Sequence, residues 1–365
     1  MKSKSLVIDP IKNEASIETV DLNDLHDEST NKIVKWKVSC VCASERRRFN
    51  LKKSHSDFNK FIAGHESVGY ISDDKDSKQL FVLLPHSNCI TREESLKCSS
   101  CQTGDYNLCK CMNHAGLSSS EPGGLSEYSS VPANQLLEIK DVPEDVAVFT
   151  EPLSCVLRSW KKIKNHKKQK VGIVGLGPIG CLHYLYSTLL YPDTQFFLFE
   201  KNEKRVEIFK KAFKNNNNYV VNIPADDLDI SIMANSNSDG FEASRKCVKK
   251  EGAVLLFSGF NEAAYKCNGF FPEFIHREEF NFYDNKTYYF GSSGYTKEDL
   301  LDSMKTLKEN NDIFRRMITG TVHGVDSNTI NCHYDEDEKF NEPILVKDMK
   351  GELSHHIKIQ YFVNN

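Results

Sequence analysis

The sequence of 365 residues is 39% hydrophobic and 27% charged, the composition of a globular protein, and its length favours two domains. Because 47 basic residues stand against 51 acidic ones, for a net charge of −4, nucleic acid is disfavoured as a partner. No apolar stretch approaches the roughly 20 residues that span a bilayer, and the N-terminus lacks the apolar core of a signal peptide. We therefore expect a cytoplasmic protein with no membrane partner.

Short alternating apolar runs, broken by Gly, Asn, Asp and Pro, extend from Leu6 to about Val148, for example at 33–38 and 81–84. Such runs are typical of antiparallel β-strands. This first part of the chain therefore predicts an irregular, mostly β domain.

Cysteines gather between Cys89 and Cys111 within that part. Cys98 and Cys101 form a CxxC step, and Cys109 follows after seven further residues. Thiolates on such a short loop can bind one tetrahedral Zn²⁺. The fourth ligand is then either Cys89, reached across an inserted segment, or Cys111. Reduced cysteines without a metal are the alternative interpretation.

The chain changes character at residue 171, where the sequence VGIVGLGPIG ends a buried strand with a GxGxxG turn and opens a helix. The first glycine permits the tight turn, the second lets a pyrophosphate approach the backbone, and the third lets helix and strand pack closely. The helix N-terminus adds unpaired N–H donors. We expect cofactor contacts from Gly175, Gly177, Pro178, Ile179 and Gly180.

Glu200 ends the next predicted strand, 195–199, twenty positions after the last glycine. An acid there accepts hydrogen bonds from ribose hydroxyls and repels a 2′-phosphate, which favours NAD over NADP. Lys201, Lys204 and Arg205 weaken that preference, and Arg205 is a further candidate contact with the cofactor. A third apolar run, 252–257, predicts another parallel strand, so the middle of the chain is expected to be a doubly wound α/β sheet. Near the C-terminus, 344–346 and 357–359 look β-like.

Together these residues resemble the zinc-containing medium-chain dehydrogenase/reductase family, in particular its polyol branch of sorbitol, xylitol, threonine and glucose dehydrogenases. The likeness runs through nearly the whole chain and depends on the order of its motifs. They are CASE at 42–45, GHE at 64–66, the cysteines with TGDYNLC at 103–109, EPL at 151–153, IHR at 275–277 and GSSGY at 291–295.

The resemblance implies a GroES-like, mostly β catalytic domain of residues 1–154, completed by 294–365. It also implies a Rossmann-type dinucleotide-binding domain of residues 155–293. Relatives pair their cofactor-domain sheets edge to edge, so a homo-oligomer, a dimer or tetramer, is expected.

It further implies that Cys42, His65 and either Glu151 or Glu66 hold a catalytic Zn²⁺ with one open position. The metal would lower the pKa of a substrate hydroxyl enough to form an alkoxide, which transfers hydride to the nicotinamide. Ser44 would relay the released proton, and Glu66 would alternate between ligation and a supporting role. The expected substrate is an alcohol or polyol, including a sugar or its phosphate.

Some positions depart from the family pattern. Ala43 replaces the motif glycine, Glu45 replaces its aspartate, and Arg47 stands where relatives often have a relay histidine. Residues 46–48, all arginines, would attract an anionic or phosphorylated substrate or form a solvated face.

The chain after Ser244 runs almost directly into Gly252, so the crossover looks shortened by about a helix, whereas a parallel crossover needs about a dozen residues. This motivates an alternative function, a catalytically impaired zinc-binding family member that acts as a binding or structural protein. Methyl transfer from S-adenosylmethionine also uses a glycine turn and a strand-end acid, but it gives no reason for the cysteines or for GHE.

Overall fold

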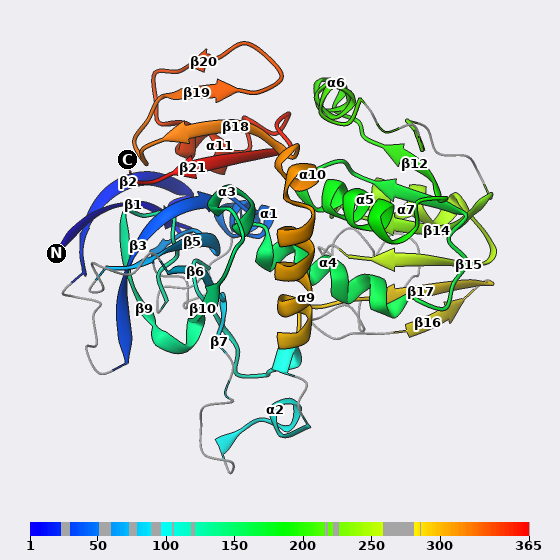
Figure 1. Cartoon of the computed structure of the whole chain (residues 1–365), viewed down its shortest axis with the longest axis horizontal. Coiled ribbons are helices and arrows are strands. Elements are labelled where there is room, and N and C mark those ends of the chain that lie inside the picture. The colour runs from blue at the N-terminus through cyan, green and yellow to red at the C-terminus, as the bar shows by residue number, and fades with distance from the viewer. Residues whose placement is uncertain are drawn as a thin grey trace. The chain divides into compact units, whose positions relative to one another are not determined.

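The computed structural model describes residues 1–22, 30–50, 60–72, 79–87, 89, 96–103, 106–117, 121–214, 216, 218–221, 226–257, 281–284 and 286–364 (Figure 1). Contacts divide the chain into two compact units, Met1–Glu151 with Met304–Asn365, and Pro152–Ser303. The assignment of catalytic and cofactor-binding roles to domains 1–154 with 294–365, and 155–293, stays a prediction. Within the described residues, no helix combines the length and apolarity that crossing a bilayer requires.

The first unit is built on two β-sheets. The smaller has the order β2-β1-β4 and the larger the order β10-β6-β5-β3-β21-β18-β19-β20, with β9 also paired to β3. All these pairs are antiparallel except β18 with β21. The strands are β1 (Lys2–Asp9), β2 (Glu14–Asp21), β3 (Asn31–Cys40), β4 (Phe61–Ile62), β5 (Glu66–Ile71), β6 (Leu80–Leu83), β9 (Tyr128–Pro132), β10 (Leu136–Ile139), β18 (Ile318–His323), β19 (Thr329–Cys332), β20 (Glu338–Lys339) and β21 (Lys358–Phe362). The predicted β domain is confirmed.

The core of this unit includes the buried rings of Trp36 and Tyr361. Short helices and a two-stranded ribbon complete the unit. A separate ribbon pairs β7 (His86–Ser87) with β8 (Asn113–His114). The helices are α1 (Ala43–Phe49), α2 (Ser99–Thr103), α3 (Glu144–Ala147), α10 (Asn311–Arg315), α11 (Ile344–Lys350) and the 3₁₀ turns Tyr106–Leu108 and Ala133–Gln135. In Figure 1, α2 lies on a segment that extends away from the strands of its own unit.

The apolar residues 344–346 begin a helix, so their β-like assignment is wrong. Pro343 occupies the N-cap of α11, and Gly351 ends the helix in a left-handed conformation with φ of 83°. This apolar run and Met349, about one turn later, are buried because they lie on the part of the helix that packs into the core. A run of three apolar residues is too short to distinguish the period of a helix from that of a strand.

The second unit is a sheet with the order β13-β12-β11-β14-β15-β17-β16. Every pair is parallel except β16 with β17. The strands are β11 (Lys170–Val174), β12 (Gln195–Phe199), β13 (Tyr219–Val220), β14 (Leu228–Met233), β15 (Val248–Leu256), β16 (Asn281–Asp284) and β17 (Thr287–Gly291). The helices are α5 (Pro178–Leu190), α6 (Glu203–Ala212) and α7 (Ser238–Lys246), while α4 (Thr150–Lys162) and α9 (Lys297–Glu309) extend across the unit boundaries. The predicted doubly wound parallel sheet is confirmed.

The expectation of a shortened crossover after Ser244 is wrong. The strand that precedes it is β14, whose six residues are all buried, and α7 connects it to the parallel strand β15. The sequence pattern did not indicate this strand, because the polar Asp229 interrupts its apolar run. Its carboxylate is buried because it accepts hydrogen bonds from the backbone N–H groups of Gln169 and Lys170, both at 2.9 Å. The crossover therefore has its helix.

Candidate functional site

The glycine turn joins β11 to α5 as the sequence pattern requires. Gly175 has a φ of 102°, a conformation that side chains with a Cβ rarely adopt. A Cβ on Gly180 would lie 1.8 Å from the carbonyl oxygen of Gly175, so only glycine lets the helix approach the turn. Gly177 has no atom within 4 Å of the position of a Cβ and caps the helix that Pro178 and Ile179 begin. Its open backbone provides the space that a pyrophosphate needs.

Glu200 follows β12 and lies against this turn. Its Oε2 accepts hydrogen bonds from Leu176 N at 3.0 Å and from Arg205 Nη1 at 2.8 Å, and its Oε1 accepts from Asn202 N at 3.0 Å. Burial raises the pKa of Glu200, but the Arg205 guanidinium and the backbone donor of Asn202 outweigh burial and hold that pKa below its usual range. A charged carboxylate is thus fixed beside the turn, with Arg205 paired to it.

Cys42, His65 and Glu66 converge within the first unit. Their potential ligand atoms lie within 4.8 Å of one another. Cys42 is the N-cap of α1, whereas Glu66 begins β5 directly after His65. Gly64 has a φ of 111°, and a Cβ there would lie 2.2 Å from Leu125 N, so glycine permits the tight turn that presents the two following side chains. Sequence spacing alone could not show this convergence.

Glu45 organises this cluster although it departs from the family motif. It is fully buried, and its Oε1 accepts hydrogen bonds from the backbone N–H groups of Gly64 and His65 at 2.7 and 2.9 Å. The same oxygen lies 3.0 Å from His65 Nδ1, while its Oε2 accepts from Cys42 N at 2.8 Å. With Nδ1 donating to the carboxylate, Nε2 of His65 keeps a lone pair for a metal. Ser44 Oγ lies 3.3 Å from that Nε2.

Lys358 is a member of this site that the sequence did not reveal. It lies on β21, is 3% exposed, and its ammonium group pairs with the Glu66 carboxylate, itself 2% exposed. Lys358 Nζ also donates to the carbonyl oxygen of Val41 at 3.4 Å. Burial lowers the pKa of Lys358, but the Glu66 carboxylate raises that pKa by more, so the Lys358 ammonium group keeps its proton.

Glu151 is buried in the first turn of α4 and is not a member of the three-residue cluster. Of the three arginines at 46–48, Arg46 forms an ion pair with the buried Asp348, which also accepts a hydrogen bond from Tyr361 OH at 2.9 Å. Arg46 therefore holds α1 against α11 and is committed to a structural contact. The stretch 275–277 lies outside the described residues.

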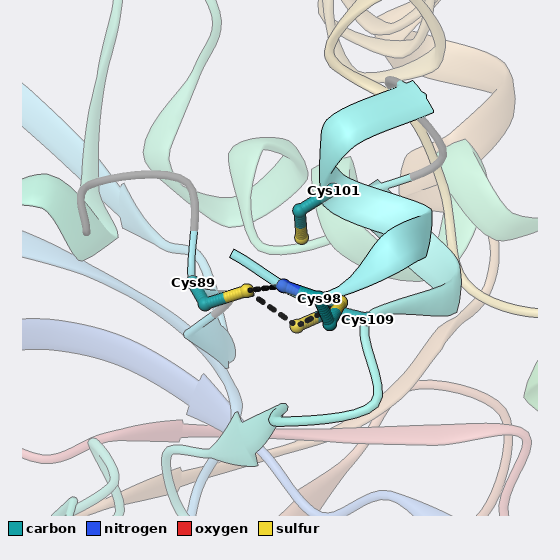
Figure 2. Close-up of side chains that lie close together, drawn as sticks. All are labelled: Cys89, Cys98, Cys101 and Cys109. Carbon is teal, nitrogen blue, oxygen red and sulfur yellow. Dashed lines mark hydrogen bonds between the residues drawn. The ribbon is translucent and has the colours of Figure 1, made fainter. Parts of the chain in front are cut away.

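Four cysteine side chains converge around α2: Cys89, Cys98, Cys101 and Cys109 (Figure 2). Cys109 Sγ lies 3.7 Å from Cys89 Sγ and 3.8 Å from Cys98 Sγ, and these sulfurs form no disulfide. A tetrahedral Zn²⁺ with bonds of about 2.3 Å spaces its sulfur ligands by about 3.8 Å, so these separations fit that ion. Cys111 is exposed and is not a member of the group.

Backbone N–H groups favour the thiolate at two of these cysteines, Cys98 and Cys89, whereas burial raises the pKa of Cys101 and Cys109. The N–H groups of Cys101 and Lys110 lower the pKa of the Cys98 thiol to about 6. The N–H of Cys98 points at Cys89 Sγ, 3.2 Å away, and lowers the pKa of that thiol. Because metal-bound cysteine is a thiolate, this local structure suits a metal.

Residues 28–141 match the alcohol dehydrogenase GroES-like domain family. The chain is 28% identical over 153 residues to erythritol/L-threitol dehydrogenase of Mycolicibacterium smegmatis, a match that covers 38% of this chain and 42% of the relative. It is 25% identical over 285 residues to glucose 1-dehydrogenase 1 of Picrophilus torridus, which covers 71% of this chain and 76% of the relative. The match thus spans less than half the length of the first of these relatives.

The solved structure of acetophenone reductase from Geotrichum candidum in complex with NAD superposes on the whole chain. The TM-score is 0.70 at 17% sequence identity, and the match covers 99% of this chain and 97% of that one. At this identity the likeness shows that both units share their fold with that protein.

Proposed function

We propose that this chain, which is similar to polyol dehydrogenases and carries an alcohol dehydrogenase GroES-like domain, is an oxidoreductase of the zinc-containing medium-chain dehydrogenase/reductase family and its polyol branch. It would exchange a hydride between an alcohol and a nicotinamide cofactor. The proposed substrate is a secondary alcohol group of a polyol, because relatives such as the erythritol/L-threitol enzyme are named for sugar alcohols.

The single observation that carries this proposal is the convergence of Cys42, His65 and Glu66. A thiolate, an imidazole and a carboxylate are the donor set of a catalytic zinc site, which binds its metal with three protein ligands and leaves one position open. A Zn²⁺ ion held there would supply a Lewis acid that lowers the pKa of a substrate hydroxyl. Glu151 is the alternative carboxylate to Glu66.

The surrounding residues have positioning roles in this proposal. Glu45 holds the His65 ring through Nδ1 and so directs Nε2 toward the metal site. Ser44, whose hydroxyl lies 3.3 Å from that Nε2, is the group that would accept the proton released by the substrate. Lys358 balances the charge of Glu66.

The proposed cofactor is NAD, which would accept the hydride at its nicotinamide ring. The backbone at Gly177 leaves room for a pyrophosphate, and the charged Glu200 carboxylate disfavours the 2′-phosphate of NADP. Arg205 is paired with Glu200, which reduces its availability for that phosphate.

We propose a second, structural Zn²⁺ held by Cys89, Cys98, Cys101 and Cys109, with Cys89 preferred over Cys111 as the fourth ligand. We also propose a homo-oligomer. Among the described residues β16 lies at one edge of its sheet, and an edge strand can pair with a second copy. Light scattering of the purified protein tests that assembly.

The test of the proposed activity combines metal analysis with an assay of NADH formation on a panel of polyols. The wild-type protein is expected to hold two zinc ions per chain, one for each cluster, and to reduce NAD with at least one polyol. Cys42→Ser is expected to lose turnover and one zinc ion while the protein stays folded, because only the catalytic cluster is broken.

Cys111→Ser is the matched control, since this exposed thiol lies outside both clusters. It should keep both metals and full activity. Unchanged turnover in Cys42→Ser would reject the assigned role of the cluster. A protein that holds zinc but forms no NADH with any polyol would favour the binding or structural alternative.

A further inference from the structure

Asn235 lies where β14 ends, directly against the glycine turn. A Cβ added to Gly175 would lie 3.3 Å from Asn235 Cβ, and one added to Gly240 would lie 1.9 Å from Asn235 Oδ1. The amide of Asn235 is therefore wedged between the start of the turn and the first turn of α7. Glycine at position 240 is what makes room for it.

The amide oxygen of Asn235 is buried and has no hydrogen-bond donor among the described residues. Neighbouring backbone donors are already engaged. Gly240 N donates to Asn237 Oδ1 at 2.7 Å, Ala234 N to Val174 O at 2.9 Å, and Leu176 N to Glu200. A buried carbonyl oxygen without a donor is costly, so an apolar side chain of the same shape would make the cofactor-free protein more stable.

The order of the strands indicates where a hydrogen-bond donor for the Asn235 oxygen would come from. β11 is flanked by β12 on one side and by β14 on the other, so the strand order reverses at β11. In open parallel sheets, ligands bind in the crevice outside the carboxyl ends of the strands at such a point. Asn235 follows β14 at that edge, opposite Glu200, which follows β12.

The chemistry of a dinucleotide narrows the choice of partner. Its phosphate oxygens only accept hydrogen bonds and are negatively charged, so an amide oxygen repels them. The groups next to the pyrophosphate that donate are the ribose hydroxyls. We propose that Asn235 Oδ1 accepts a hydrogen bond from a ribose hydroxyl of the bound dinucleotide and thereby positions the cofactor. This inference rests on the cofactor assigned under the proposed function.

The test is the replacement Asn235→Leu, which keeps the branched shape and removes the acceptor. We expect the dissociation constant of NADH, measured by fluorescence titration, to rise about tenfold, the effect of one lost hydrogen bond to the ligand. The thermal midpoint of the cofactor-free variant should equal or exceed that of the wild type, because an unsatisfied oxygen has been removed. Its rise on adding NADH should be smaller than in the wild type.

The matched control is Ser236→Ala, at the exposed neighbouring residue, which should bind NADH like the wild type. An unchanged NADH affinity in Asn235→Leu would overturn the inference. So would a lower midpoint of the cofactor-free variant, because that result marks a residue needed for the fold alone. If the wild-type protein itself fails to bind NADH, the proposed cofactor is wrong, and the inference about Asn235 fails with it.

Discussion

The buried pair of Lys358 and Glu66 shows how single residues determine the properties of the cluster proposed to be catalytic. Neither charge has access to water, so each depends on the other for compensation. Lys358 donates to one oxygen of the Glu66 carboxylate, which is a proposed ligand of the metal. The pair therefore links the last strand of the chain to the proposed zinc site.

Removing one member of this pair tests that dependence. Lys358→Met is expected to lower the free energy of unfolding by about 3 kcal/mol or more, because it leaves a buried carboxylate without a counter-charge. Urea denaturation measures the loss. The double variant Lys358→Met with Glu66→Gln should recover much of it, since the orphaned charge is then gone. A single variant as stable as the wild type would contradict the assigned pairing.

Among single residues, those in local motifs were predictable from the sequence, whereas contact partners far apart in the chain were not. Cys42, His65 and Glu66 came from short motifs of a known family, but Glu66 and Lys358 are 292 positions apart, and no sequence pattern joins them. From the sequence, Glu45 appeared only as a departure from the family motif. Its side chain accepts hydrogen bonds from three backbone N–H groups and lies against the His65 ring, and these contacts depend on a fold that sequence spacing does not reveal.

The glycine turn contains one glycine that the fold requires and another that only a bound ligand would require. Gly180 is required by packing, because a Cβ there would meet the carbonyl oxygen of Gly175. Gly177 has a φ of −68° and open space around its Cβ position, so the fold itself tolerates a side chain there. Only a ligand that approaches the backbone at Gly177 would make that glycine necessary.

The variants Gly177→Ala and Gly180→Ala are therefore expected to behave differently. Gly177→Ala should keep the wild-type thermal midpoint, within about 0.5 kcal/mol of stability, but bind NAD much more weakly, as measured by calorimetry. Gly180→Ala should lower the stability by about 1–3 kcal/mol through overpacking. Equal NAD affinity in Gly177→Ala and the wild type would rule out a pyrophosphate at this turn.

Strands and helices were predictable where the apolar residues clearly follow the pattern of one type of element. The strands around the glycine turn are continuous apolar runs, and the structure has them at β11 and β12. The strand β14 was missed because Asp229 and Ser231 interrupt its apolar run, although both are buried. α11 was misassigned because three apolar residues suit a strand as well as a helix, and only the burial of Met349 on the same face decides.

At the scale of the whole molecule, each unit carries its own proposed ligand and its own fluorophore. The chain has two tryptophans: Trp36, buried in the first unit, and Trp160, buried in the second. Both clusters proposed to bind zinc belong to the first unit and the glycine turn to the second. A change in sequence texture near residue 171 indicated such a division, but the return of residues 304–365 to the first unit depended on the family resemblance.

The single-tryptophan variants Trp160→Phe and Trp36→Phe allow each unit to be followed during thermal unfolding. Removing zinc with a chelator should lower the midpoint reported by Trp36 more than that reported by Trp160, because metal binding to the cysteine cluster is folding free energy of the first unit. NAD at about a hundred times its dissociation constant should stabilise the state that binds it by about 2.7 kcal/mol, and Trp160 should report the larger rise. NAD is preferred over NADH here because the reduced ring absorbs tryptophan emission. Equal shifts of both reporters under both treatments would contradict the assignment of the metals and the cofactor to separate units.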